Sequence, residues 1–312
     1  MAETRTVRSW VRIAVFAAGI LAAGGAAFGD AAASADDAAG TWEHPFFRRP
    51  VLLGAHRGGM YWRPENTLVA YRDAAAQWPE IVLEGDARLT ADGAVALLHD
   101  ETVDRTTDGV GAVAEMTLAE VQRLDAGYWF TPDGGASYPY RGRGIRVPTL
   151  REALDTAPGH RFLIEIKGGP EMAEAVLGVI AEAQAEDHVL LGAFDEATMD
   201  RVRRLAPTLP RCFSMVSAME MLTAYRAGNW SAYAPKDDVL TLGPAHLKQF
   251  GITPSLIAVI REKGVRVQLY DINTPREMRS ALAMGVDGIL TGFPERLAAM
   301  IDEASGNIAP GE

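Results

Sequence analysis

The stretch IVLEGDARLTADGAVALLHD, residues 81–100, decides the fold because it holds two strand-like runs with a very short connection between them. Residues 81–89 and 94–98 are rich in apolar side chains, and only the turn sequence TADG separates them. A parallel crossover needs about a dozen residues or more, so the two runs must be antiparallel neighbours. The sequence therefore predicts a hairpin, with a register that places His99 opposite Glu84.

The rest of the chain alternates between apolar strand-like runs and helical patterns, which is typical of a parallel sheet. Helices are expected from Thr67, Pro170 and Thr274, the last ending near Gly285. Parallel strands are expected at residues 51–55, 81–89, 161–166, 188–193, 211–215, 239–242, 265–270 and 286–290. We predict an α/β fold, a (β/α)₈ TIM barrel with a small antiparallel hairpin excursion after strand 2.

Polar side chains close several of these strands, at the end of the barrel where active sites lie. Glu84 and Asp86 are two residues apart and therefore share one face of a strand, where they repel each other unless a cation compensates them. Burying an unpaired carboxylate costs several kcal/mol, so a partner is required. The polar residues expected at this rim are His56, Arg57, Glu84, Asp86, His99, Asp100, Glu165, Lys167 and Asn273.

Each of these residues also has a plainer interpretation. His56 could be a hydrogen-bonded structural histidine, and the two acids of the second strand could form a salt-bridged rim. Glu165 and Lys167 could be an ordinary surface pair, and Asn273 could begin the next helix. Their combination at one rim favours a functional site over these separate explanations.

The residue types at the rim point to phosphate chemistry. Oxygen ligands without thiolates select a hard ion, Mg²⁺ or Ca²⁺. An arginine and a lysine beside that ion select an anion, most naturally a phosphate. Two imidazoles can take and return a proton near neutral pH. The sequence thus predicts a metal-assisted reaction of a phosphate ester.

Several short motifs at this rim occur in one order: HRG with PENT, E-x-D, T-x-DG with HD, DRTT-x-G-x-G, PTL-x-E-A-L, EIK and GVDGILT. Together they resemble the glycerophosphodiester phosphodiesterase family, and the match runs from Val51 to about Leu297. The resemblance implies a metal-dependent barrel enzyme that hydrolyses glycerophosphodiesters to glycerol 3-phosphate and an alcohol. In that family the residues matching Glu84, Asp86 and Glu165 hold the metal.

The resemblance also implies roles for the remaining residues. Those that match His56 and His99 are the catalytic acid and base, and those that match Arg57 and Lys167 bind the substrate phosphate. Which histidine is the acid stays open, as does the nucleophile, either water or the glycerol 2-hydroxyl. Glu65 and Asn66 of PENT are expected to shape the first loop rather than to bind metal.

The chain departs from the family pattern near its end. Residues 270–273 read Tyr-Asp-Ile-Asn where the family has Trp-Thr-Val-Asn, and Gly292 replaces a usual aspartate. Tyr270 and Asn273 are candidates for contact with the substrate, whose identity these changes affect. Two alternatives stay open: a lysophospholipid or sphingolipid phosphodiesterase with the same site, and a barrel that binds phosphodiesters without catalysis.

The N-terminal segment differs from the rest of the chain. Three arginines precede an apolar run over residues 13–28, and Ala-Ser-Ala at 33–35 fits a cleavage site. The run is shorter than the ~20 residues of a membrane span, so an uncleaved anchor is the weaker alternative. We expect a signal peptide at 1–35, a polar lead-in at 36–50, the barrel at 51–303 and a tail at 304–312. The protein would then be exported, either periplasmic or secreted.

Composition excludes some partners. The formal net charge is −11, which disfavours nucleic acid as a partner. Cys212 is the single cysteine, so the chain offers neither an internal disulfide nor a cysteine-based metal site. The expected partner is a small glycerophosphodiester, with membrane contact only transient and only if lysolipids are substrates.

The long loop over residues 127–146 precedes the third parallel strand and contains aromatic residues, five glycines and three arginines. Long loops at the active face of a barrel are often lids or specificity loops. We expect this loop to close over the substrate and to help select its alcohol portion, the alternative being a simple cover for the barrel.

Overall fold

Seven parallel strands of the protein form one sheet, which a short segment between its two edges closes into a ring. The computed structural model describes residues 44–48 and 52–305, and hydrogen bonds join the strands in the order β5-β4-β2-β1-β8-β7-β6. The parallel strands are β1 (Leu53–Ala55), β2 (Val82–Leu89), β4 (Arg161–Ile166), β5 (Val189–Gly192), β6 (Val239–Leu242), β7 (Arg266–Leu269) and β8 (Gly288–Thr291). The predicted barrel is confirmed.

A short segment closes the ring between β5 and β6. Arg211 bridges to Leu191, and Cys212 bridges to Val239, both in parallel. This segment takes the place of the strand predicted at 211–215, which is shorter than expected because helix α6 already begins at Met215. The barrel is therefore complete, but its seam here rests on single residue pairs.

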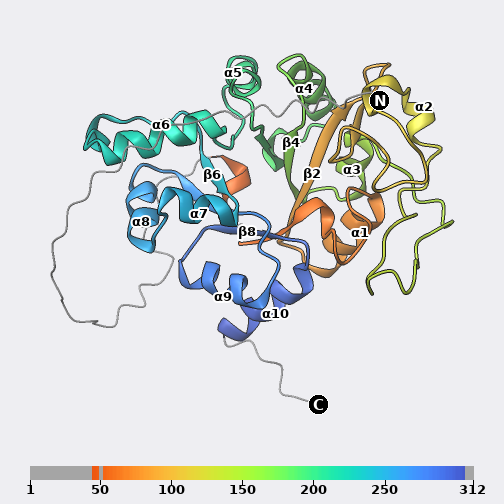
Figure 1. The fold of residues 1–312 in the computed structure, drawn as a ribbon. Helices are drawn as coiled ribbons and strands as arrows, with labels where there is room; N and C mark the ends of the chain where they lie inside the picture. The colour runs from red at the N-terminus through yellow and green to blue at the C-terminus, as the bar shows by residue number, and fades with distance from the viewer. Residues whose placement is uncertain (1–43, 49–51, 306–312) are drawn as a thin grey trace, which may run out of the picture. The chain divides into compact units, whose positions relative to one another are not determined.

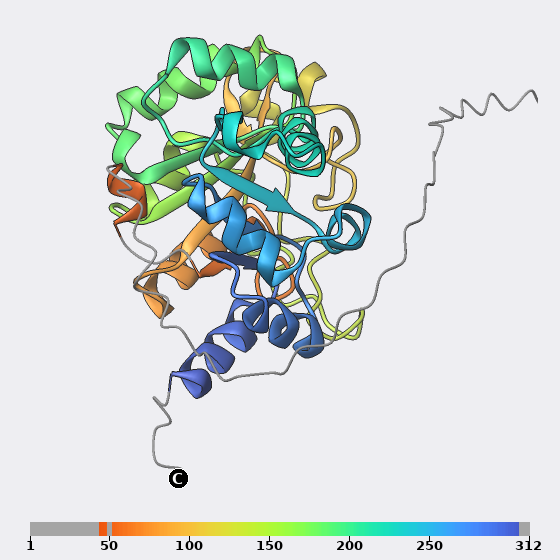
Figure 2. The same cartoon turned by 90° about the vertical axis from the view of Figure 1, so that its left-hand side faces the viewer.

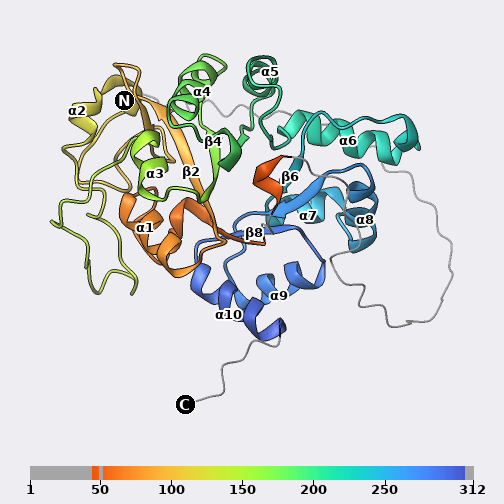
Figure 3. The same cartoon turned by 180° about the vertical axis from the view of Figure 1, so that it is seen from behind.

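Helices follow the strands and cover the outside of the barrel (Figure 1). In both side views α4 and α5 lie on one side of the strands, and α9 and α10 lie on the opposite side (Figures 1 and 3). The same separation of green and blue helices is visible after a quarter turn (Figure 2). The helices are α1 (Leu68–Gln77), α2 (Leu118–Val121), α3 (Leu150–Thr156), α4 (Met172–Glu182), α5 (Glu196–Leu205), α6 (Met215–Arg226), α7 (Pro244–Phe250), α8 (Pro254–Glu262), α9 (Pro275–Ala283) and α10 (Pro294–Ala304).

The helix boundaries follow the capping residues in the sequence. The Thr67 side chain caps α1, and Thr274 with Glu277 forms a capping box at the start of α9. Gly285 has a φ of 67° just after α9, a conformation that glycine adopts without strain. The helix expected from Pro170 begins two residues later, at Met172.

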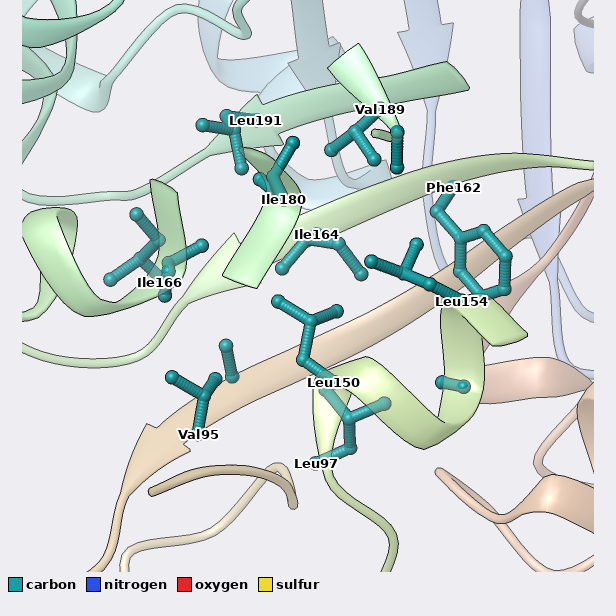
Figure 4. Packing of buried hydrophobic residues seen from close by; sticks show 14 of the residues in the cluster. Val95, Leu97, Leu150, Leu154, Phe162, Ile164, Ile166, Ile180, Val189 and Leu191 are labelled. Carbon is teal, nitrogen blue, oxygen red and sulfur yellow. The ribbon is translucent and has the colours of Figure 1, made fainter. Parts of the chain in front are cut away.

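Alternation along the strands separates the core from the site. In β4, Phe162, Ile164 and Ile166 belong to the cluster packed between strands and helices (Figure 4). Leu163 and Glu165, the residues between them, point to the inside of the barrel because successive side chains of a strand face opposite ways. The same period in β2 directs its two acids inward.

The hairpin after β2 is present with a register one residue away from the prediction. Strand β3 (Val95–Leu97) pairs antiparallel with β2, and Leu89 lies opposite Val95. The turn contains three residues rather than four, since the Thr90 N–H donates to the Ala94 carbonyl and Gly93 has a φ of 79°. His99 is therefore not opposite Glu84, although it still reaches the same cavity.

The lead-in contributes to the core. Phe46 and Phe47, in a short 3₁₀ helix (Pro45–Phe47), are 1% and 5% exposed. They belong to the same buried cluster as Val82, Leu163 and Leu290 from three barrel strands. Folded structure thus begins before residue 51, where the barrel was expected to start.

The predicted signal peptide at 1–35 and most of the predicted tail lie outside the described residues. No helix within residues 44–48 and 52–305 is long and apolar enough to cross a bilayer.

Candidate active site

A cavity of about 300 Å³ opens at the C-terminal ends of the strands. Its polar wall is formed by His56, Arg57, Glu84, His99, Glu165 and Lys167. Its opposite wall is largely apolar and includes Leu163, Ala193, Phe194, Phe213, Tyr270 and Leu290. The barrel therefore brings the candidate catalytic residues from β1, β2, the hairpin and β4 into one place.

Three carboxylates form a cluster at the polar wall. Oxygen atoms of Glu84, Asp86 and Glu165 lie within 4.8 Å of one another. Glu84 is 2% exposed and Asp86 is 1% exposed, so solvent contributes little to their stabilisation. Burial raises the pKa of Glu84 to about 8, and the neighbouring Asp86 carboxylate adds to the shift. The cluster needs positive charge to hold all three groups ionised.

This cluster fits a hard divalent cation. Among the residues that the structure describes, no group donates a hydrogen bond to the buried Oδ1 of Asp86. Lys167 Nζ lies 3.3 Å from that oxygen as an ion-pair contact. An unbonded buried carboxylate oxygen beside two further carboxylates is the donor set that Mg²⁺ or Ca²⁺ prefers. The metal could thus be held by all three predicted ligands.

Asn66 fixes the orientation of Asp86. Its Nδ2 donates to Asp86 Oδ2 at 2.8 Å, and its Oδ1 accepts from the Asp86 backbone N–H at 3.2 Å and from the Tyr71 hydroxyl at 2.9 Å. Asn66 is 2% exposed, and its φ of 55° is a conformation that asparagine tolerates better than most residues. With Oδ2 held by Asn66, Oδ1 of Asp86 is left to the ion-pair contact with Lys167.

The two candidate phosphate ligands are already held by carboxylates. Arg57 has a φ of 52°, its backbone N–H donates to Glu84 Oε2 at 2.5 Å, and its Nη1 donates to Glu65 Oε1 at 3.1 Å. Lys167 Nζ lies 2.8 Å from Glu165 Oε1. Burial would lower the pKa of Lys167, but Asp86 and Glu165 outweigh it and raise that pKa. Both side chains therefore stay cationic at the wall of the cavity.

Each candidate histidine has a carboxylate beside its Nδ1. His99 Nδ1 lies 2.7 Å from Asp100 Oδ1, and His56 Nδ1 lies 3.4 Å from Asp271 Oδ1. Burial lowers the pKa of His99. Burial would also lower the pKa of His56, but Asp271 and Glu84 outweigh it and raise that pKa. The contact of His99 Nδ1 with Asp100 leaves Nε2 of that ring for proton transfer, whereas His56 Nδ1 has only the ion-pair contact with Asp271.

The two candidate substrate contacts lie in different surroundings. Tyr270 lines the cavity. Asn273 is not among the lining residues: its Nδ2 donates to Asp271 Oδ1 at 3.1 Å, and its Oδ1 accepts from the Gly292 N–H at 2.8 Å. Asn273 thus joins the loops after β7 and β8, and it supports Asp271, which faces His56.

Some residues that support the site were not predicted from the sequence. Arg88 donates through Nε and Nη2 to the His99 carbonyl and through Nη1 to the Lys167 carbonyl, so it clamps two site segments. Tyr71, Asp271 and Arg105 were also missed. The DRTT motif contained Arg105, and residues 270–273 contained Asp271, but their partners Glu65 and His56 lie far away in the sequence.

The long loop over residues 127–146, here called the aromatic loop, is held in its conformation by its own residues. Gly134, Gly135, Gly142 and Gly144 have φ values of 69°, 100°, 68° and 71°, so each occupies a turn that disfavours other residues. The Arg141 guanidinium lies over the rings of Tyr128 and Tyr138, at 4.1 Å and 3.9 Å. Its glycines and this arginine therefore have local roles, which weakens the reason for expecting a mobile lid.

Comparison with known proteins identifies the family of the chain. The profile of the "Glycerophosphoryl diester phosphodiesterase family" matches residues 56–296. A glycerophosphodiester phosphodiesterase of Caldanaerobacter subterraneus subsp. tengcongensis is 32% identical over 80% of this chain and 98% of its own length.

Solved structures agree as well. A glycerophosphodiester phosphodiesterase of Agrobacterium tumefaciens shares 27% identity with a TM-score of 0.64, covering 80% of this chain and 99% of that one. A phosphodiesterase of Oleispira antarctica, solved with its product sn-glycerol 3-phosphate, has the same fold at 24% identity and a TM-score of 0.65, covering 81% and 97%. The chain belongs to the glycerophosphoryl diester phosphodiesterase family.

Proposed function

We propose that the protein hydrolyses glycerophosphodiesters to glycerol 3-phosphate and an alcohol in the cavity at the C-terminal ends of its strands. The observation that carries this proposal is the convergence of three carboxylates, two histidines, an arginine and a lysine on one cavity of about 300 Å³. Membership of the family gives the reaction class, and the product bound to the Oleispira antarctica protein supports the substrate class.

The metal in this proposal is Ca²⁺ or Mg²⁺, held by Glu84, Asp86 and Glu165. When bound, such an ion neutralises charge on the phosphate oxygens. Asp86 Oδ1, which accepts no hydrogen bond among the described residues, and the absence of sulfur ligands in the cluster support a hard ion. Asn66 contributes by fixing the orientation of the Asp86 carboxylate through its bond to Oδ2.

Arg57 and Lys167 would bind the non-bridging oxygens of the phosphate. Both cations border the cavity, and both stand next to the carboxylate cluster. Charge-assisted hydrogen bonds from fixed donors stabilise the additional negative charge of the transition state. Because Glu65 and Glu165 already orient these side chains, little rearrangement is needed when the substrate arrives.

His56 and His99 would move the protons. One imidazole takes the proton of the attacking hydroxyl group, and the other protonates the departing alkoxide. Asp100 holds the His99 ring by a hydrogen bond at Nδ1, and Asp271 lies 3.4 Å from Nδ1 of His56 as an ion-pair contact. Water and the glycerol 2-hydroxyl are both compatible with this pair, and detection of a cyclic phosphate would identify the second route.

The apolar wall of the cavity affects which alcohol portion of the substrate can bind. Phe194, Phe213 and Tyr270 face the cavity opposite the charged residues, so the alcohol portion can include apolar groups. This wall is the specific observation in favour of a second candidate, a lysophospholipid phosphodiesterase with the same catalytic residues. In that case the protein would contact membranes transiently.

Export is part of the proposal. It rests on the arginines, the apolar run and the Ala-Ser-Ala sequence within residues 1–35. Sequencing the N-terminus of the protein recovered outside the cytoplasm would test it, since cleavage after residue 35 is expected.

Product analysis tests the function. The protein is incubated with glycerophosphocholine after chelation and again after addition of Ca²⁺ or Mg²⁺, with lysophosphatidylcholine in parallel. We expect glycerol 3-phosphate and choline from the first substrate only when a divalent ion is present. Turnover of the lysolipid alone would favour the second candidate, and phosphocholine as product would contradict both.

A further inference from the structure

A chain of ion pairs joins one acid–base group of the polar wall, His99, to one of its two cations, Arg57. Asp100 contacts His99 Nδ1 at 2.7 Å, and Glu65 accepts from Arg57 Nη1 at 3.1 Å. Arg105 lies between these two carboxylates and bonds to both. The chain thus runs from His99 through Asp100, Arg105 and Glu65 to Arg57.

Arg105 uses its planar guanidinium as a fork on each side. Its Nη1 and Nη2 donate to the two oxygens of Glu65, both at 2.8 Å. Its Nε and Nη2 donate to the two oxygens of Asp100, at 2.6 Å and 3.2 Å. Two bidentate contacts fix the position of the loop that contains Asp100 relative to the loop that contains Glu65, which is 40 residues from Arg105 in the sequence.

The partners of Arg105 are the groups that orient the proposed catalytic machinery. Asp100 is the residue that holds the His99 ring, and its side chain is 33% exposed, so it has room to rotate. The Glu65 side chain is only 9% exposed and is shared with Arg57. Arg105 itself is outside the lining of the main cavity and touches neither histidine.

We propose that Arg105 is a positioning residue that holds His99, through Asp100, and Arg57, through Glu65, in register with each other. This inference rests on the proposed function because it assigns catalytic work to His99. Arg105 ties the hairpin, which carries one proton-transfer group, to the loop after β1, which carries the phosphate ligand. A displacement of about 1 Å between such groups can reduce the rate of a reaction by about 10²-fold.

A purely structural role predicts something different. The Arg105 side chain is 46% exposed and that of Asp100 is 33% exposed, so their pair contributes little to stability, and the nearly buried Glu65 keeps its pair with Arg57 when Arg105 is removed. Its removal should therefore change the melting temperature little. A large kinetic loss with a small change of stability is the signature of positioning.

The test is a double-mutant cycle on the full chain with glycerophosphocholine as the substrate. Arg105→Ala should lower kcat by about 10- to 100-fold while metal affinity and melting temperature stay near those of the wild type. Arg151→Ala is the matched control, because Arg151 makes an exposed ion pair with Asp155 on α3. In the His99→Ala background, the loss caused by Arg105→Ala should be at least several times smaller.

Two results would overturn the inference. The first is an equal loss of kcat from Arg105→Ala in the wild-type and His99→Ala backgrounds, since Arg105 would then act independently of His99. The second is a wild-type rate for Arg105→Lys, which keeps the charge but lacks the fork. If Arg105→Ala lowers the melting temperature far more than the control does, the rate of Arg105→Lys is measured in its place, because lysine keeps the charge. Wild-type turnover of His99→Ala alone would instead reject the proposed catalytic role of His99.

Discussion

The two walls of the cavity are built in different ways. The polar wall comes from β1, β2, the hairpin and β4, where β2 and β4 pair over six residues. The apolar wall draws mainly on β5, residues 211–213, β6, β7 and β8, and part of it is closed by the single bridges at Arg211 and Cys212. Apart from Asp271, which follows β7, the charged groups that line the cavity thus come from the half of the barrel that contains the β2–β4 pairing.

This difference follows from the cost of burial. A buried charge requires defined partners, so each group of the polar wall is held by a second residue, as Asn66 holds Asp86 and Asp100 holds His99. Apolar side chains need only volume and contact, which tolerate exchange. We infer that the polar wall fixes the chemistry, whereas the apolar wall adapts to the alcohol portion of the substrate.

The largest effect is expected from removing a proton-transfer group of the polar wall. His56→Ala and His99→Ala should each lower turnover by about 10²–10⁴-fold, because general acid–base catalysis contributes that much. Metal affinity should be retained in both variants, as measured by calorimetric titration with Ca²⁺ or Mg²⁺. Near wild-type turnover at either position would mean that this histidine is structural.

A large loss of stability is expected at the seam between β5 and β6, where single residue pairs close the barrel. The Asp237 side chain is fully buried and pairs with Arg203 at 2.6 Å and Arg211 at 3.3 Å. Asp237→Ala should lower the free energy of unfolding by about 3–5 kcal/mol, since it breaks a buried ion-pair network. Lys236→Ala, which removes an exposed pair with Glu220, should cost at most about 1 kcal/mol.

Denaturant titration compares the two seam variants. If Asp237→Ala were no more destabilising than Lys236→Ala, the ion pairs would not hold the seam. The catalytic parameters of the remaining folded protein should change little, because Asp237 does not line the cavity.

A smaller effect is expected from changing one metal ligand. Glu165→Gln removes one negative charge but keeps the shape of the side chain, so metal affinity should fall by about 100-fold or more, beyond the loss caused by outer partners of a metal site. The variant should recover part of its activity at high metal concentration. Unchanged metal binding and turnover would remove Glu165 from the site.

The smallest effect is expected from the aromatic loop, which lies outside both walls. Trp129, Phe130 and Thr131 line a separate cavity of about 240 Å³ that also includes Glu65 and Arg105. A short turn in place of residues 131–144 should shift the turnover ratio between glycerophosphocholine and lysophosphatidylcholine by a few-fold, with metal affinity intact. If both substrates kept the original ratio, the loop would only cover the barrel.

The fold could be predicted from the sequence because its signals are local. Strand periodicity, the capping threonines and the length of the TADG turn each depend on neighbouring residues. The register of the hairpin was wrong by one residue, since the αL conformation of Gly93 and the hydrogen bond from Thr90 to Ala94 shorten the turn. The strand predicted at residues 211–215 was too long because helix α6 already begins at Met215.

The candidate site could be located from the sequence only in part. Residues that end a strand were found because the barrel places all strand ends on one face. The supporting contacts could not be predicted, since Asn66 to Asp86, Arg105 to Glu65 and Asp271 to His56 join loops whose geometry no local pattern specifies. Their partners became identifiable only with the three-dimensional arrangement.

The most direct test of the division between the walls is the ratio of kcat/KM for glycerophosphocholine to that for lysophosphatidylcholine. It is measured for the wild type, His99→Ala and Phe194→Ala; Phe194 lines the apolar wall and is 49% exposed, so its removal leaves the core intact. We predict that His99→Ala lowers both values and preserves the ratio, whereas Phe194→Ala changes the ratio by about tenfold or more. A ratio that shifts with His99→Ala and stays constant with Phe194→Ala would contradict the account.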